Sequence, residues 1–77
     1  MPSLANANKQ EQVIRALERA GFVRRSGGKH TILAHSDGRY TVIPNHRQLK
    51  VGTLWAILKQ CGLSETQYLD LYAGKRE

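Results

Sequence analysis

Residues 22–44 read FVRRSGGKHTILAHSDGRYTVIP, and this stretch decides the fold. Two turns that contain glycine, Ser26-Gly27-Gly28 and Ser36-Asp37-Gly38, divide it into three short segments. Asp-Gly between apolar segments is a strong hairpin signal, and Pro44 lacks the N–H needed to continue a strand. The stretch therefore predicts three antiparallel strands, over residues 22–25, 29–35 and 39–43.

A helix is predicted before the strands. Asn8 and Glu11 have the spacing of an N-cap and an N3 residue. Apolar residues then recur at helical spacing as far as Gly21, which ends the pattern. These signals predict a helix over residues 9–20, and we expect residues 1–7 to be frayed.

Two further helices are predicted after the strands. An apolar stripe at i, i+3, i+4 and i+7 spacing ends at Gly62, and its members are Leu54, Ile57, Leu58 and Cys61. Ser64-Glu65-Thr66-Gln67 is a capping box that opens a third helix over residues 64–73. The resulting order is α-β-β-β-α-α. We expect an α+β sandwich of the double-stranded-RNA-binding type, with helices on one face of the sheet and the other face open.

The chain has 77 residues, which make a single domain over 1–77, and a net charge of +6. Half of its basic residues lie between positions 24 and 50, together with only one acid, Asp37. We predict that these basic residues bind RNA phosphates: Arg24, Arg25, Lys29, Arg39, Arg47 and Lys50. The alternative is that they form only a solvated face. Cys61 is the only cysteine, and no apolar run approaches membrane-spanning length, which favours a cytoplasmic protein without a membrane partner.

Three histidines are the side chains best suited to proton transfer near neutral pH: His30, His35 and His46. His30 follows Lys29 and opens a predicted strand directly after a Gly-Gly turn, and the two glycines allow a large ligand to approach closely. No cysteine or acid stands at helical ligand spacing from any histidine, so we predict no metal site. Gly27-Gly28-Lys29 lacks the spacing of a phosphate-binding P-loop.

Several motifs together resemble the HicA toxin family over roughly residues 9–72. They are Gly28-Lys29-His30, Val42-Ile43-Pro44-Asn45-His46, Gly52-Thr53-Leu54 and Ile57-Leu58-Lys59-Gln60-Cys61-Gly62-Leu63. The resemblance implies a toxin that cleaves messenger RNA and is neutralised by a HicB antitoxin. It places the essential histidine at His30 and makes His46 a secondary candidate. The chain departs from the family at Lys29, where serine is usual, and at Trp55, where we expect a basic or polar residue.

The predicted mechanism needs no metal and no cofactor, because RNA supplies its own nucleophile, the 2′-OH. His30 would act as general base on that hydroxyl or as general acid on the leaving 5′-oxygen. The second proton carrier could be Lys29, His46 or water. Two alternatives are a non-catalytic RNA-binding module of the same fold and a protein whose surface serves only a protein partner.

Overall fold

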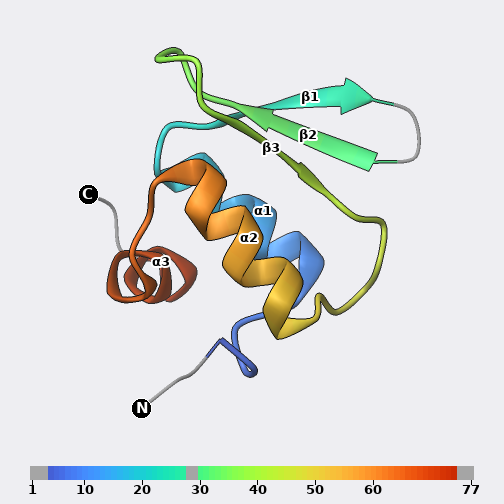
Figure 1. The fold of residues 1–77 in the computed structure, drawn as a ribbon, viewed down its shortest axis with the longest axis vertical. Helices are drawn as coiled ribbons and strands as arrows, with labels where there is room; N and C mark the ends of the chain where they lie inside the picture. The colour runs from blue at the N-terminus through green and yellow to red at the C-terminus, as the bar shows by residue number, and fades with distance from the viewer. Residues whose placement is uncertain (1–3, 28–29, 75–77) are drawn as a thin grey trace.

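Six elements follow one another in the predicted order. The computed structural model describes residues 4–27 and 30–74, which form α1 (Gln10–Arg19), β1 (Val23–Gly27), β2 (His30–Ala34), β3 (Tyr40–Ile43), α2 (Val51–Cys61) and α3 (Glu65–Tyr72) (Figure 1). The sheet is antiparallel with strand order β1-β2-β3. The α+β class and the α-β-β-β-α-α order are therefore confirmed, and β1 and β3 are the two edge strands.

The turn between β2 and β3 explains why both strands are shorter than predicted. The His35 N–H donates to the Arg39 carbonyl at 2.8 Å, and the Gly38 N–H donates to the His35 carbonyl at 3.0 Å. These bonds close a three-residue loop in which Gly38 has a φ of 99°, a left-handed conformation that favours glycine. As a result β2 ends at Ala34 and β3 begins at Tyr40.

The pairing register decides which side chains face the helices. Thr31 pairs with Ile43, and Leu33 pairs with Thr41. Of these four residues, Leu33, Ile43 and Thr41 are fully buried. Both α1 and α2 lie on this side of the sheet, whereas α3 lies farther from it, against α1 (Figure 1). Because side chains alternate along a strand, the residues between them point to the other side.

A single core lies between the sheet and the helices. Its largest fully buried side chains are Tyr68, Ile14, Leu17, Leu33, Ile43, Leu54, Leu58, Leu71, Val13, Thr41 and Cys61. The apolar stripe of α2 and the apolar face of α1 both contribute to it, as their spacing predicted. Among the described residues, no helix is long and apolar enough to cross a membrane.

The N-terminal segment packs more closely than predicted. Leu4 is 4% exposed and Ala7 is 2% exposed, and the hydroxyl of Tyr68 in α3 donates to the Ala7 carbonyl. The expectation that residues 1–7 fray is therefore wrong for residues 4–7, because apolar contacts with the core hold them. Residues 1–3 lie outside the described part of the chain.

The ends of the helices confirm one predicted cap and correct another. In α3 the Ser64 backbone N–H donates to Gln67 Oε1 at 2.9 Å, and the Gln67 N–H donates to Ser64 Oγ at 3.1 Å, as the capping box requires. At the start of α1 the N-cap is Lys9, without a side-chain cap bond. Asn8, the predicted cap, donates instead to the Leu49 carbonyl at 3.0 Å.

Candidate active site

The face of the sheet that points away from the helices is called the open face here. By the register, its side chains are Val23 and Arg25 from β1, His30, Ile32 and Ala34 from β2, and Tyr40 and Val42 from β3. All acids in the described part of the chain lie elsewhere: Glu11 and Glu18 in α1, Asp37 in the β2–β3 turn, and Glu65 and Asp70 in α3. The open face therefore combines apolar side chains with one arginine and one histidine, and carries no described carboxylate.

His30 stands at one end of this face. It is the first residue of β2, pairs with Gly27 of β1, and is exposed. Since Thr31 pairs with Ile43, one further step along the ladder brings His30 beside Pro44, just past the end of β3. The chain after β3 thus leaves the sheet next to His30. Lys29, which precedes His30, lies outside the described residues.

The loop between β3 and α2 is held by the start of α1. The Gln10 N–H donates to the Arg47 carbonyl at 2.9 Å, and the Gln10 side-chain amide donates to the Pro44 carbonyl at 2.9 Å. The Leu49 N–H donates to the Asn8 carbonyl at 2.8 Å, and the Asn8 side-chain amide donates to the Leu49 carbonyl. These four bonds, which we call the clasp, fix the backbone of the loop. The sequence offered no signal for it, because Asn8 and Gln10 are remote from the loop along the chain.

His46 lies in the clasped loop and is exposed. It lines a hollow of about 360 Å³ together with Lys50 and Thr53, which belong to the start of α2. The first turn of α2 contains no acid. The positive end of the helix dipole and the Lys50 ammonium group therefore act in the same direction, and both favour an anion such as a phosphate.

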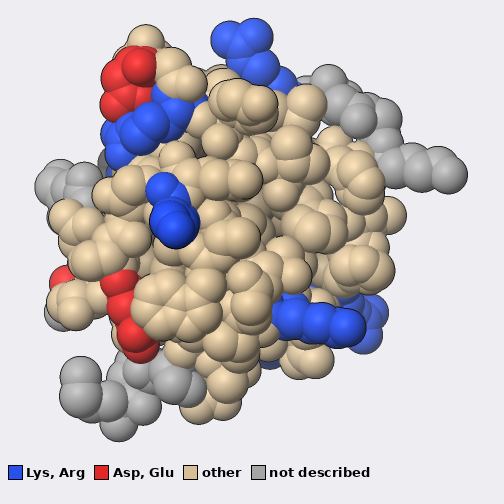
Figure 2. Space-filling view, viewed as in Figure 1, with Lys and Arg blue, Asp and Glu red and all other residues tan. Residues whose placement is uncertain are grey.

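Three of the predicted RNA-binding residues remain exposed and available. Arg25 lies on the open face, Arg47 in the clasped loop, and Lys50 at the N-cap of α2. In the view of Figure 2, acidic atoms lie on the left-hand side, whereas basic atoms lie on the left, at the top and at the lower right, where β3 leads into α2 in Figure 1. The lower right of this view thus shows basic atoms without acidic atoms beside them.

Arg24 has a different environment from its neighbour Arg25. It pairs with Leu33, so its side chain lies on the helix side of the sheet. Its guanidinium group lies 3.1 Å from a carboxylate oxygen of Glu11 and 3.5 Å from one of Glu18, both in α1. The hydrogen bond that Arg24 donates to the Glu11 carboxylate raises the pKa of Arg24. The structure does not bring Arg24 to the open face.

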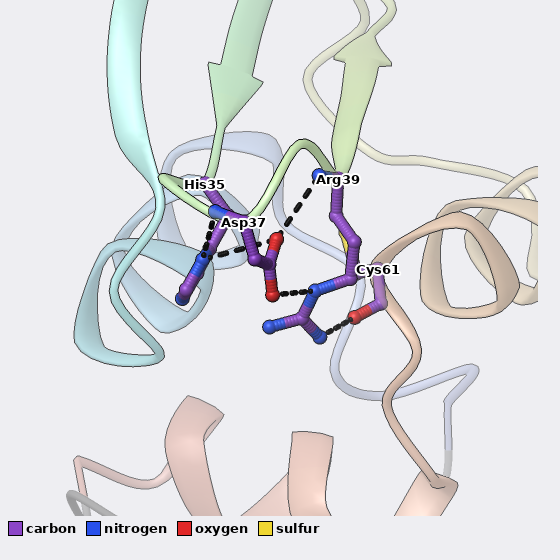
Figure 3. A network of polar contacts seen from close by, with 4 residues as sticks. All are labelled: His35, Asp37, Arg39 and Cys61. Carbon is purple, nitrogen blue, oxygen red and sulfur yellow. Dashed lines mark hydrogen bonds and ion pairs between the residues drawn. The ribbon is translucent and has the colours of Figure 1, made fainter.

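Arg39 also has internal partners, which Figure 3 shows. Its Nε donates to Asp37 at 2.8 Å, and its Nη1 donates to the Cys61 carbonyl at the end of α2. The guanidinium carbon lies 5.3 Å from the centre of the Phe22 ring. The Arg39 backbone N–H, with the guanidinium group, lowers the pKa of the Asp37 carboxyl. Arg39 therefore joins the β2–β3 turn to α2.

His35 belongs to the same network and lies on the helix side, opposite to His30. Its ring packs edge-on against Phe22 with centroids 5.1 Å apart, and its Nδ1 accepts from the Asp37 N–H at 3.2 Å (Figure 3). These contacts support the turn rather than the open face. Five positions separate the two histidines, and because side chains alternate along a strand, they point to opposite faces.

Cys61 is buried in the core at the end of α2, and burial raises the pKa of its thiol to about 11. The thiol is thus protonated at neutral pH, which does not suit a nucleophile or a metal ligand. In residues 4–27 and 30–74, no three His, Cys, Asp or Glu side chains come together as a metal site.

Comparison with known proteins agrees with the resemblance seen in the motifs. A family model described as the HicA toxin of bacterial toxin-antitoxin matches residues 11–63, which include the whole sheet, the clasped loop and α2. No curated protein matches the chain. Because the matched region covers more than half of the sequence, the chain belongs to the HicA family of bacterial toxin–antitoxin toxins.

Proposed function

We propose that this toxin is a metal-independent endoribonuclease that cleaves messenger RNA, with His30 as general acid or base. The observation that carries the proposal is the position of His30. It is exposed on a sheet face without described carboxylates, and it lies beside the point where β3 leads into the loop that carries His46. A long RNA can reach an open face of this kind.

The proposed reaction uses the 2′-OH of the RNA as nucleophile. As the 2′-oxygen bonds to phosphorus, the bond to the 5′-oxygen breaks. The base takes the 2′ proton, and the acid gives a proton to the 5′-oxygen. The products are a 2′,3′-cyclic phosphate and a 5′-hydroxyl end. An imidazole can fill either role near neutral pH.

His46 is the better candidate for the second proton carrier. The register and the clasp bring its loop to the end of the sheet that holds His30, and its hollow also contains Lys50. Lys29 is the other candidate. We assign phosphate binding to Arg25, Lys29, Arg47 and Lys50. Arg24 and Arg39 are left out because each is already paired with carboxylates or a carbonyl of this chain.

The partner expected for this toxin is a HicB-type antitoxin, and the expected compartment is the cytoplasm. A basic face without carboxylates is complemented by an acidic protein. We propose that the antitoxin covers the open face and His30 and leaves α3 outside the contact. Hydrogen exchange of the complex should then show protection in β2 and β3. Protection confined to α3 would contradict this arrangement.

Cleavage of a long single-stranded RNA, with and without a chelator, tests the proposed function. The wild type should cleave in both conditions and leave cyclic phosphate ends. His30→Ala should lose about 10²–10⁴-fold in rate while its stability changes by no more than about 0.5 kcal/mol. His35→Ala is the matched control and should keep most of the activity of the folded fraction.

A substrate control separates this mechanism from others. An oligonucleotide with 2′-deoxyribose at the cleaved position lacks the nucleophile and should resist the enzyme. Cleavage of that oligonucleotide, or cleavage by folded His30→Ala at the wild-type rate, would refute the mechanism.

A further inference from the structure

A hollow lies along the outer edge of β3, away from His30. Its volume is about 500 Å³, and it is lined by Gly38, Arg39, Tyr40, Val42 and Gln60. It therefore joins the β2–β3 turn, the edge strand and the last part of α2. None of the roles assigned above to His30, His46 or the basic residues uses this hollow.

Tyr40 and Val42 give the hollow an apolar, partly aromatic wall. Both lie on the open face, where Tyr40 is 62% exposed and Val42 is 42% exposed. Within the described part of the chain, no residue forms a hydrogen bond with the Tyr40 hydroxyl. An exposed aromatic side chain beside apolar neighbours is typical of a binding surface.

Polar groups line the other side of the hollow. The Thr41 hydroxyl donates to Gln60 Oε1 at 2.6 Å, which fixes the orientation of the Gln60 amide. Among the described residues, no acceptor takes the amide hydrogens of Gln60. In addition, β3 is an edge strand, so half of its backbone groups lack a partner in the sheet. The hollow thus offers hydrogen-bond donors beside an aromatic face.

Tyr40 of the hollow and His30 lie on the same face of the sheet. Tyr40 pairs with Ala34, and His30 lies four residues before Ala34 on the same strand and the same face. This spacing is about 13 Å along β2. No described carboxylate lies between the two positions, and Arg25 stands on the same face. Charge complementarity along this path favours an anionic occupant, and the ribonuclease function proposed above supplies RNA as that occupant.

We propose that this hollow is a nucleobase subsite, in which a base farther along the RNA from the cleaved phosphate stacks on Tyr40 and accepts a hydrogen bond from the Gln60 amide. The inference rests on the proposed ribonuclease function and deepens it. Stacking on an aromatic ring is tolerant of sequence, because every base has a π face. The subsite would therefore strengthen binding of single-stranded RNA with only a modest preference among bases.

A series of oligonucleotides of increasing length tests the subsite. Each carries a single ribonucleotide, so that cleavage occurs at one fixed position, and the chain is extended by one nucleotide at a time on either side. Tyr40→Ala should leave kcat/KM unchanged for the shortest substrates. It should lower kcat/KM by about 5- to 140-fold once the oligonucleotide is long enough for a base to reach Tyr40. This loss should appear when the oligonucleotide is extended on one side of the cleaved position and not on the other. Tyr40→Phe keeps the ring and should behave as the wild type.

Trp55→Ala is the matched control. Trp55 is another exposed aromatic residue, 48% accessible, but it lies on α2 and outside the open face. Its replacement should leave cleavage unchanged at every length. Gln60→Ala is a poorer test, because it also removes the hydrogen-bond partner of the buried Thr41 hydroxyl.

Three outcomes overturn the subsite while leaving the ribonuclease proposal intact. The first is a loss of kcat/KM in Tyr40→Ala that is equal at all oligonucleotide lengths, and the second is no loss of kcat/KM at any length. The third is a variant that cleaves RNA normally and loses only the binding of a protein partner. The last outcome would assign the β3 edge to a protein strand instead. If the wild type itself fails to cleave RNA in a manner that depends on His30, the proposed function fails first.

Discussion

Arg24 and Arg25 are adjacent on β1 but lie on opposite faces of the sheet, and this difference gives a direct test of the proposed RNA surface. Arg24→Ala and Arg25→Ala each remove one positive charge. The long-range attraction of the protein for RNA therefore falls to the same extent in both variants. Any further difference between them must come from local contacts.

For Arg24→Ala we expect a loss of stability. Its two ion pairs, at 3.1 and 3.5 Å, join side chains that are 38–53% exposed. Exposed pairs contribute about 0.2–1 kcal/mol each, so the free energy of unfolding should fall by about 1 kcal/mol. In a domain of this size that corresponds to a Tm lower by about 4–8 °C. The dependence of RNA affinity on salt should keep its slope.

For Arg25→Ala we expect the opposite pattern. Arg25 is exposed on the open face, so its removal should change stability by less than about 0.5 kcal/mol. The loss of one phosphate contact should make the slope of log affinity against log salt shallower by about 0.7. Thermal unfolding and fluorescence-anisotropy titrations with single-stranded RNA, in the His30→Ala background, measure both quantities. If Arg24→Ala changes the salt slope as much as Arg25→Ala does, the assignment of the open face to RNA is wrong.

Three further predictions concern the clasp, the N-terminal segment and the core. Gln10→Ala removes the 2.9 Å hydrogen bond to the Pro44 carbonyl. The free energy of unfolding, measured by thermal unfolding, should fall by about 0.5–1.5 kcal/mol. The substitution should also lower kcat more than it raises KM, and an unchanged kcat would contradict a positioning role. Tyr68→Phe removes the donor to the Ala7 carbonyl and should cost about 1–3 kcal/mol in urea unfolding; an unchanged midpoint would show that the segment is not held by this bond. Burial raises the pKa of the Cys61 thiol from 9 to about 11, so the free energy of unfolding should fall as the pH rises through this range, and the fall should be smaller in Cys61→Ala.

Local patterns in the sequence predicted the elements well. The Asp-Gly pair at the β2–β3 turn and the Ser64–Gln67 capping box each involve residues within four positions of one another. Such signals can be read directly from the chain. The start of α1 was misread because the Asn8 amide bonds to Leu49, 41 positions away. A long-range partner replaced the local cap that the spacing had suggested.

The candidate site was predictable only in part, for the same reason. The exposure of His30 followed from its place after a glycine turn at the start of a strand. Counting charges could not distinguish Arg24 or Arg39 from Arg25. The partners of Arg24 belong to α1, and Arg39 reaches the end of α2. Only the assembled fold decides which cations remain available to a ligand.

The size of the chain also explains where the site lies. One face of a three-stranded sheet and three helices are all used to build the core, so chemistry is left to the opposite face and its rim. The two histidines there are positioned by backbone contacts. His30 is placed by strand pairing with Gly27, and His46 by backbone bonds from Gln10 to its loop. A site held in this way stays shallow, which suits the long RNA substrate proposed above. For the same reason the antitoxin proposed above would have to cover only this one face.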